Sequence, residues 1–379
     1  METTQPLISI IMPIYNAELY IDAAINSVIQ QTFKDWELIL VDDASKDNSY
    51  NICKEWAEKD SRITVRHLST NKGAGNARNV GMDLSKGRYI TFMDADDTLD
   101  KGLYESVTSG INQETVLYSK QDPKKHKTKK EERIVTDTDM VVWGVTEEYY
   151  NHKGKHTGSN ILSLEDAVYN TPEMVRRKVI RLEDRTLFGY QWNHLYKREI
   201  IKDNNIRFEK VTLYEDYFFN LKVIEHINTM IVSSNCGYHY YKRENQSLTN
   251  TYVPEYYKLS RRRVESMYET YKRWQMYTPE VKNSCGQRLV RYTLSALVRN
   301  CSPKSNMSHK DRRKWVKRLY KDNLYRAVAK HCYIEQIPLR ILRGLINRHC
   351  TGLILTMGRF VYIVKEGKPD IFAKKRQIH

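Results

Sequence analysis

Three carboxylates stand within four residues at Asp94, Asp96 and Asp97, directly after a short apolar stretch. Residues 89–93 are apolar and rich in strand-forming types, so they predict a buried strand that ends where the acids begin. Anions this close repel one another and cost stability unless a cation lies among them. Carboxylate oxygens on a loop suit Mg²⁺ or Mn²⁺, and such an ion in turn suits a diphosphate. The alternative for an isolated Asp-x-Asp is a solvated acidic turn.

Two further polar clusters follow apolar runs nearer the N-terminus. Pro13, Tyr15 and Asn16 come after the first run, and Asp42 and Asp43 come after the second. Strands are predicted at 7–12, 36–41, 63–67 and 89–93, alternating with helices at 17–29, 48–57 and 74–84. This alternation predicts a doubly wound, mostly parallel sheet flanked by helices, in which ligands bind beyond the carboxyl ends of the strands. Asn16 is expected to cap the first helix.

The charge is concentrated at one end of the chain. Of 379 residues, 1–110 contain 11 Lys and Arg against 17 Asp and Glu, whereas 255–379 contain 29 against 9. The C-terminal third therefore predicts an anionic partner such as lipid head groups, a phosphorylated carrier or nucleic acid. No signal sequence and no run long enough to span a membrane is found. Six scattered cysteines without a C-x-x-C suggest reduced thiols in a cytosolic protein.

The middle and end of the chain give weaker patterns. Residues 115–138 predict an exposed connection and 151–159 a loop, and Trp192, Leu195 and Tyr196 are at helical spacing within 191–200. Further strands are predicted at 140–143, 231–232 and 237–241, and a basic helix at 173–182. From Pro254 onward the sequence predicts basic helices at 257–274, 282–299, 311–331 and 339–348.

Residues 8–97 resemble the N-terminal half of a family 2 glycosyltransferase of GT-A fold. The matching motifs are Pro13-x-Tyr15-Asn16, Val41-Asp42-Asp43-x-Ser45, Asn71-x-Gly73 with Ala77-Arg78-Asn79-x-Gly81, and Asp94-x-Asp96-Asp97. The similarity resumes more weakly at Trp192 to Tyr196, at Glu215-Asp216 and at 238–247. The resemblance implies a GT-A domain at 1–250, with a nucleotide-sugar-binding half at 1–110 and an acceptor-side half at 111–250, before a basic helical region at 251–379.

The resemblance implies a donor site at the strand ends. It places Tyr15 against the nucleobase with the Pro13 backbone nearby, and it assigns the uracil N3–H to Asp43 while Asp42 orients the turn. It implies that Asp96 binds a Mn²⁺ or Mg²⁺ ion directly and that Asp94 holds the donor sugar or ribose, with Asp94 also a candidate ligand of the ion. For single acids of this kind the usual role is helix capping.

Three further assignments complete the predicted site. Arg78 would lie close to the diphosphate, because a guanidinium fork suits phosphate oxygens, although its ordinary role would be a surface ion pair. The resemblance implies that Asp216, or else Glu215, takes the proton from the acceptor hydroxyl. The aromatic side chains of an acceptor groove, which would stack on sugar rings, are Trp192, Tyr214 and Tyr240, with core packing as the default for any single one. Arg243 and Ser247 are expected on a loop near the diphosphate.

The sequence therefore predicts an inverting, metal-dependent enzyme that moves a sugar from a nucleotide sugar, preferably a UDP-sugar, to a hydroxyl of a glycan or lipid-linked acceptor in cell-surface polysaccharide synthesis. The alternatives are a nucleotide-sugar-binding protein without catalysis and a nucleic-acid-binding protein; the acidic N-terminal half argues against nucleic acid. The basic helices would complete the acceptor side or rest on an anionic membrane at its cytoplasmic face, and the alternative is a solvated cap with a contact between identical chains.

Overall fold

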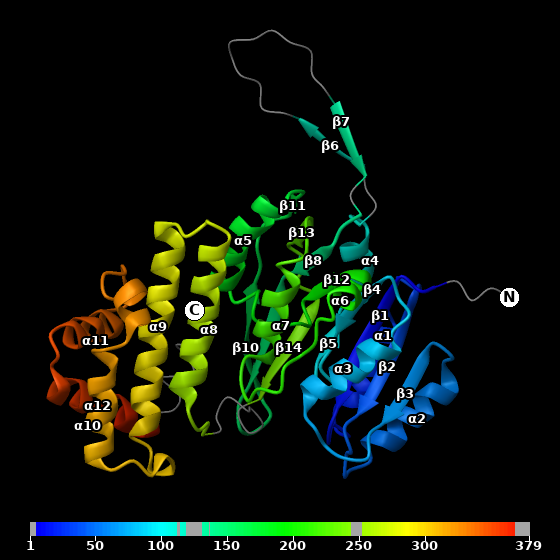
Figure 1. Ribbon diagram of the computed structural model, residues 1–379. Coiled ribbons are helices and arrows are strands. Elements are labelled where there is room, and N and C mark those ends of the chain that lie inside the picture. Colours follow the sequence, from blue (N-terminus) through cyan, green and yellow to red (C-terminus); the bar gives the residue numbers. More distant parts are fainter. Residues whose placement is uncertain (1–4, 112–113, 119–130, 136, 244–251, 368–379) are drawn as a thin grey trace, which may run out of the picture. The chain divides into compact units, whose positions relative to one another are not determined.

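The computed structural model describes residues 5–111, 114–118, 131–135, 137–243 and 252–367 (Figure 1). They form two compact units. The N-terminal unit comprises Met1–Val211 with Glu215–Glu244, and the C-terminal unit comprises Thr212–Tyr214 with Asn245–His379. Ser247, which the sequence placed on a loop near the diphosphate, lies outside the described residues.

The core of the N-terminal unit is an eight-stranded sheet in the order β11-β13-β8-β12-β4-β1-β2-β3. The half β4-β1-β2-β3 is parallel and corresponds to the four strands predicted from the sequence. These are β1 (Ile8–Ile14), β2 (Trp36–Asp42), β3 (Ile63–His67) and β4 (Tyr89–Phe92). β1 and β4 are buried almost throughout, because helices pack on the sheet faces. The predicted α/β fold class is confirmed.

The helices between these strands are α1 (Ile21–Ile29), α2 (Ser49–Lys59) and α3 (Ala74–Leu84). The prediction that Asn16 caps the first helix is wrong. Asn16 has a left-handed backbone (φ 51°), and its side-chain oxygen accepts a hydrogen bond from Lys46 N at 2.8 Å. Tyr20 precedes α1 instead. Asn16 therefore joins the turn after β1 to the turn after β2, which fixes two of the loops at the sheet edge.

The second half of the large sheet mixes directions. It contains β8 (Met140–Trp143), β11 (Ala167–Tyr169), β12 (His194–Lys197) and β13 (Met230–Ser233). β12 runs antiparallel to both β4 and β8, so the helix suggested by the spacing of Trp192, Leu195 and Tyr196 is wrong there. His194, Leu195 and Tyr196 are all fully buried, which removes the alternation that would have identified a strand. The helices of this half are α4 (Leu103–Thr108), α5 (Pro172–Asp184), α6 (Arg198–Asp203) and α7 (Glu215–Val223).

A second sheet of four strands has the order β10-β9-β14-β5. Its strands are β5 (Thr98–Leu99), β9 (Val145–Tyr150), β10 (His156–Leu162) and β14 (Tyr238–Arg243). The loop predicted for 151–159 therefore ends earlier than expected, because His156 already begins β10. Within the stretch predicted as an exposed connection, β6 (Glu114–Tyr118) and β7 (Glu131–Val135) form a separate antiparallel pair.

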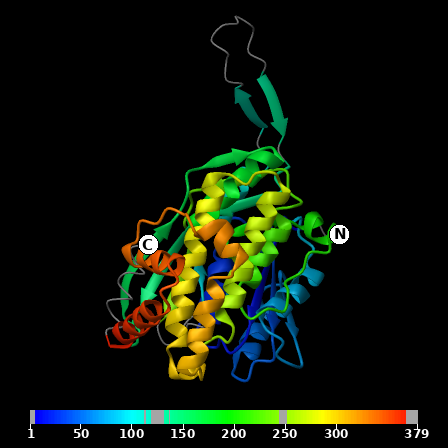
Figure 2. The same cartoon turned by 60° about the vertical axis from the view of Figure 1, so that its left-hand side comes forward.

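The C-terminal unit is helical (Figure 2). It comprises α8 (Tyr256–Arg273), α9 (Pro279–Asn300), a short 3-10 turn at Pro303–Ser305, α10 (His309–Leu319), a π-turn at Tyr325–Ala329, α11 (Ile337–Asn347) and α12 (Thr351–Gly367). The single helix predicted for 311–331 is wrong, because the Asp322 carboxylate accepts hydrogen bonds from Leu324 N and Tyr325 N and turns the chain there. α12 was not predicted.

Candidate active site

The turn after β2 holds two buried acids that face different partners. Asp42 Oδ2 lies 2.7 Å from His67 Nδ1 on β3, while Asp42 Oδ1 is buried without a hydrogen-bond partner in the described part of the chain. Asp43 accepts hydrogen bonds from Lys72 N at 3.0 Å and from Gly73 N at 2.7 Å. Gly73 has a φ of 93°, which suits glycine, and it precedes α3. Asp43 thus fixes the start of α3 against the end of β2.

Tyr15 stands at the carboxyl end of β1 and is half exposed, so its ring is accessible. Pro13 forms part of β1 itself, paired in register with Val41 of β2. Both residues therefore lie at the edge of the sheet where β2 ends in Asp42 and Asp43.

The side chain of Arg78 is the centre of a charged cluster. It extends from α3, is 5% exposed, and donates to Asp94 Oδ1 at 2.9 Å, Glu215 Oε1 at 2.9 Å and Asp216 Oδ1 at 3.1 Å. Its burial disfavours the charged form, but the charges of Asp216, Asp94 and Glu215 outweigh this and raise the pKa of Arg78. Asp94 is 16 residues from Arg78 in the sequence, and Glu215 and Asp216 are 137 and 138 residues from it. The three acids thus meet at one cation.

Gln191 belongs to the same cluster, and sequence reasoning did not single it out. With its amide oxygen facing Arg78, the oxygen accepts from Arg78 Nη2 at 2.7 Å, and the amide nitrogen donates to both oxygens of Asp216 at 3.0 and 2.8 Å. Gln191 is fully buried. A buried side-chain amide needs partners at both ends, and here they are an arginine and a carboxylate. An uncharged residue without a motif gave no signal in the sequence.

The acids that follow β4 differ in burial. Asp97 is fully buried and accepts from Tyr238 Oη at 2.8 Å and Tyr241 N at 2.9 Å, so it ties this stretch to β14. Asp96 is partly exposed, and Arg243 Nη1 lies 3.1 Å from its Oδ2. Burial and the charge of Asp94 raise the pKa of Asp96 to about 6, although Arg243 opposes this. Burial and the neighbouring charges of Asp96 and Asp94 raise the pKa of Asp97 well above its usual value.

Burial is the main cause of these raised pKa values and the neighbouring carboxylates add to it, so a divalent cation bound here would favour the ionised forms. No group of three or more His, Cys, Asp or Glu side chains that could hold a metal ion is found among the described residues. The partly exposed carboxylates of Asp94 and Asp96 would suit Mg²⁺ or Mn²⁺ bound through one or two carboxylates and completed by substrate phosphates, which is how Mg²⁺ is usually held with nucleotides.

The predicted acceptor aromatics belong to two different units of the chain. Trp192 is stacked on Tyr238 with ring centroids 4.3 Å apart and on Tyr190 at 4.5 Å, and it is 2% exposed. Tyr240 lies beside it, 5.2 Å from the Trp192 ring. Tyr214 belongs to the C-terminal unit, where its hydroxyl lies 2.9 Å from Ser260 Oγ and its ring packs near Tyr292.

Tyr15, Asp43 and Asp96 lie at the carboxyl ends of parallel strands, which is where ligands bind in open α/β sheets. The family described as "Glycosyl transferase family 2" matches residues 9–204, about half of the chain. The chain therefore belongs to glycosyl transferase family 2, and it is an enzyme of the glycosyltransferase class.

Individual relatives point the same way. An uncharacterized glycosyltransferase, EpsJ of Bacillus subtilis (strain 168), is 28% identical over 342 residues, which are 89% of this chain and 90% of that protein. The poly(ribitol-phosphate) beta-N-acetylglucosaminyltransferase TarS of Staphylococcus aureus (strain Mu50) is 27% identical over 252 residues, or 65% of this chain and 37% of TarS. A crystal structure of S. aureus TarS 1–349 in complex with UDP-GlcNAc has a TM-score of 0.57 at 21% identity and covers 95% of this chain and 92% of that one. This structural similarity shows the GT-A fold.

None of the helices in the described ranges is both long and apolar enough to cross a membrane.

Proposed function

We propose that this glycosyltransferase transfers a sugar, with inversion, from a UDP-sugar to a hydroxyl of a glycan or lipid-linked acceptor in cell-surface polysaccharide synthesis. The observation that carries the proposal is the gathering of Asp94, Glu215 and Asp216 around Arg78. Relatives named for teichoic acid and teichuronic acid synthesis support the surface polysaccharide, and the UDP-GlcNAc complex of TarS supports the donor.

The donor would lie over the carboxyl ends of β1, β2 and β4. Tyr15 would stack on the base, and Asp43, whose carboxylate is held by two backbone N–H groups, has lone pairs left to accept from a uracil N3–H. The Asp42 carboxylate, paired with His67, would orient the turn. Arg78 lies next to Asp94, and a diphosphate bound there would compete with the acids for its guanidinium.

Asp96 and Asp94 would hold a Mn²⁺ or Mg²⁺ ion together with the diphosphate. The bound ion would stabilise the negative charge that develops on the departing nucleoside diphosphate. Binding requires an ionised Asp96, which the ion itself favours because it opposes the burial and the repulsion from Asp94 that raise the pKa of this carboxyl.

Asp216 would act as the general base. It would accept the proton of the acceptor hydroxyl while the hydroxyl oxygen attacks the anomeric carbon from the face opposite the diphosphate. Hydrogen bonds from Arg78 and Gln191 favour the ionised form of Asp216 that this role needs. Burial raises the pKa of Glu215 in spite of Arg78, so Glu215 is less readily ionised than an ordinary glutamate, and Asp216 is preferred as the base.

For the acceptor, we assign contact to Tyr240 and a supporting role to Trp192, whose rings lie side by side. Trp192 is covered on both faces by Tyr190 and Tyr238, so it would hold the wall of the groove without touching a sugar. The acceptor-binding role of Tyr214 stays a prediction. The division into a GT-A domain at 1–250 and a basic region at 251–379 is likewise retained as a proposal.

A thermal-shift screen tests the donor and the metal. UDP-, GDP- and dTDP-sugars would be added with and without Mn²⁺, because a ligand that binds only the folded state raises the melting temperature. We expect the largest shift with a UDP-sugar plus Mn²⁺, and its loss in Asp96→Asn. A shift that is independent of Mn²⁺ and of Asp96 would remove the metal assignment.

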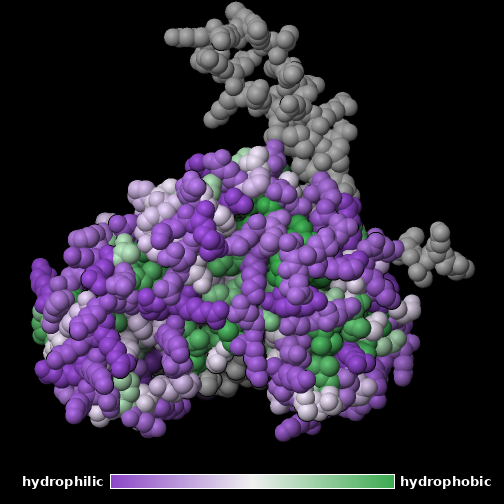
Figure 3. All heavy atoms as spheres, viewed as in Figure 1, coloured by the Kyte–Doolittle hydropathy of each residue, from purple (hydrophilic) through white to green (hydrophobic). Residues whose placement is uncertain are grey.

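We further propose that the C-terminal unit attaches to an anionic membrane surface. Six large apolar side chains of this unit, on α11, α12 and the segment before them, are more than half exposed: Tyr333, Ile337, Ile341, Leu353, Phe360 and Ile363. Residues 309–365 carry 14 Lys and Arg against 3 Asp and Glu. The viewed face of the molecule is mostly hydrophilic with small hydrophobic areas between (Figure 3). Apolar side chains among cations suit lipid with anionic head groups.

A further inference from the structure

A hollow of about 400 Å³ opens on the second sheet, and none of its lining residues is one that is assigned to the donor. Its walls come from all four strands of that sheet. The lining comprises Thr98, Leu99 and Asp100 at β5, Glu148 and Tyr150 on β9, His156 and Ser159 on β10, and His239 and Tyr241 on β14. Alternate residues of a strand point to one face, so Glu148 with Tyr150 and His239 with Tyr241 line the hollow by the regular geometry of the sheet. The hollow is therefore formed mainly by the strands of the sheet, not by a loop.

The polar groups of the hollow form a chain of acids and imidazoles. Glu148 Oε2 lies 2.7 Å from His156 Nε2, Glu148 Oε1 lies 3.1 Å from His239 Nδ1, and His239 Nε2 lies 3.1 Å from Asp100 Oδ1. Ser159 Oγ also donates to Glu148 Oε2. Burial opposes ionisation of Glu148, but the hydrogen bonds of Ser159, His156 and His239 outweigh it and lower the pKa of Glu148.

The remaining hydrogen-bonding capacity is mainly that of an acceptor. A carboxylate has about four lone-pair sites, and Ser159, His156 and His239 use three of those of Glu148. Asp100, whose side chain is 68% exposed, stands at the rim with one oxygen paired to His239. A ligand that donates several hydrogen bonds suits these oxygens, whereas phosphate or carboxylate groups would meet repulsion from two acids.

Aromatic rings supply the second kind of contact. The Tyr150 ring lies 5.8 Å from that of Tyr241 and 5.2 Å from that of His156, between centroids. Rings next to hydrogen-bonding side chains are common in sites for small molecules, and 400 Å³ is within the usual range for such sites. A pyranose has an apolar face for the rings and hydroxyl groups for the carboxylates.

The hollow adjoins the Asp94–Asp97 stretch through β14. Tyr241 lines the hollow, and its backbone N–H donates to Asp97 Oδ1 at 2.9 Å. Arg243, two residues further on the same face, lies 4.9 Å from the Tyr241 ring and pairs with Asp96. A molecule in the hollow would therefore lie next to residues that connect directly to the proposed donor site.

We infer that this hollow is a second carbohydrate-binding site, which takes an uncharged sugar unit through Glu148, Asp100 and the rings of Tyr150 and Tyr241. Binding of the sugar does not depend on the transfer reaction. Only the identity of the occupant, a unit of the acceptor glycan distant from the reacting hydroxyl, rests on the proposed function.

Saturation-transfer NMR with the full chain tests the inference. The probes are neutral mono- to tetrasaccharides of glucose, galactose, N-acetylglucosamine and rhamnose, measured with UDP and Mn²⁺ in excess to block the donor site. We expect at least one saccharide to bind under these conditions. Glu148→Gln and Tyr150→Ala should each weaken its binding about tenfold or more, since each removes a charged acceptor or a ring contact.

Tyr149→Ala is the matched control, because Tyr149 is the next residue on β9 and its hydroxyl donates to Glu147 on the opposite face. It should leave saccharide binding unchanged, and circular dichroism should show all variants folded. The inference is overturned if no saccharide binds with the donor site blocked, or if the Tyr149 and Tyr150 variants weaken binding alike. Donor binding in the thermal-shift screen would then still stand, so the two proposals fail separately.

Discussion

The carboxylate of Asp216 accepts hydrogen bonds from Arg78 and Gln191, so an uncharged isostere tests its role with little change of shape. We expect Asp216→Asn to lower the rate of sugar transfer by 10²–10⁴-fold, the usual contribution of a general base. Donor affinity should stay within about threefold, because this carboxylate is not assigned to the donor. Steady-state transfer and donor titration measure the two. Equal losses of rate and donor affinity would contradict the assignment of Asp216 as base.

A second test concerns Arg78. It distinguishes binding of the diphosphate, which the sequence predicted for Arg78, from stabilisation of the fold by its ion pairs with three acids. In Arg78→Met, three carboxylates that are each about a quarter exposed lose their shared cation. We expect a loss of about 2 kcal/mol in the free energy of unfolding at neutral pH, below the range for fully buried pairs because these acids keep some solvent. Urea unfolding measures it.

The loss in Arg78→Met should shrink toward about pH 4. Without Arg78 the pKa of Glu215, which burial already raises, would rise further above its unfolded value, so protonation favours the folded variant and this stability is lost as pH rises through the raised value. Arg207→Met is the control, since Arg207 is partly exposed and pairs with the exposed Asp83. Unchanged stability with lost affinity for UDP would favour the diphosphate role alone.

At this scale, the sequence identified the acids but not their partner. Asp94 and Asp96 could be singled out because acids directly after a strand are visible in the chain, whereas Asp216 was assigned only through the family resemblance. The contact of Asp216 with Arg78 could not be predicted, because 138 residues separate the two and nothing local specifies that contact. Gln191 gave no signal, since its importance arises only from the two charged neighbours between which it is buried.

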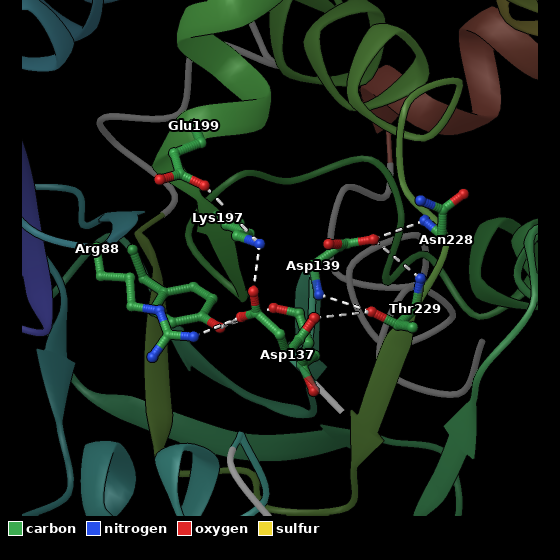
Figure 4. A network of polar contacts seen from close by, with 9 residues as sticks. Arg88, Asp137, Asp139, Lys197, Glu199, Asn228 and Thr229 are labelled. Carbon is green, nitrogen blue, oxygen red and sulfur yellow. Dashed lines mark hydrogen bonds and ion pairs between the residues drawn. The ribbon is translucent and has the colours of Figure 1, made fainter. Parts of the chain in front are cut away.

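Among the elements, the junction of β4, β8 and β12 depends on Asp137. Its carboxylate lies 2.5 Å from both Arg88 Nη2 and Lys197 Nζ (Figure 4). Partial burial opposes ionisation, but the hydrogen bonds and charges of Lys197 and Arg88 outweigh it and lower the pKa of Asp137 from 3.8. Asp139, two residues on, accepts from Asn228 N and Thr229 N and so holds the chain before β13.

Asp137→Asn should cost about 1 kcal/mol of unfolding free energy at neutral pH, a modest value because the side chain is half exposed and screened. The folded pKa is depressed, so this stability is present above pH 3.8 and is lost as pH falls through the lower folded value. Denaturant unfolding from neutral pH to about pH 3 measures the difference. Exposed Asp35→Asn is the control. A cost that is the same at both ends of this range would show that charge is not the cause.

The contact of α3 with β1 depends on Gly81. A Cβ atom at Gly81 would lie 2.3 Å from Ile11 Cγ2. Gly81→Ala should therefore destabilise by about 1–3 kcal/mol, more than the gain in helix propensity returns. Gly102→Ala, where no atom lies within 4 Å, should change stability by less than about 0.5 kcal/mol. The cost of Gly81→Ala should fall in an Ile11→Ala background, and an unchanged cost there would contradict the steric explanation.

The elements show why prediction succeeded unevenly. β1, β2 and β4 are continuous apolar runs bounded by turn residues, so local pattern was sufficient. β12 is buried on both faces and lost its alternation, and the second sheet pairs β14 with β9 across about 90 residues. Such pairings form only when the whole sheet assembles, and the sequence between the two strands does not predict their register.

At the scale of the whole molecule, the uneven charge decides what covers the exposed apolar side chains of α11 and α12. A second copy of the chain would bring another 29 Lys and Arg against 9 Asp and Glu from residues 255–379 to the same contact. Like charges oppose that association, whereas anionic lipid attracts the same surface. The full chain should therefore sediment with vesicles of phosphatidylcholine and phosphatidylglycerol, and added salt should release it.

Replacing apolar side chains separates insertion from simple charge attraction. Phe360 and Ile363 are 66% and 57% exposed, and burial of each in lipid would contribute about 1.5 kcal/mol or more. The double variant Phe360→Ser, Ile363→Ser should therefore bind the anionic vesicles about a hundredfold more weakly. Ile161→Ser, at an exposed apolar position of β10 in the other unit, should bind as the unmodified chain does. If the double variant instead binds vesicles normally while a concentration-dependent dimer dissociates, the surface is a contact between identical chains and the membrane proposal fails.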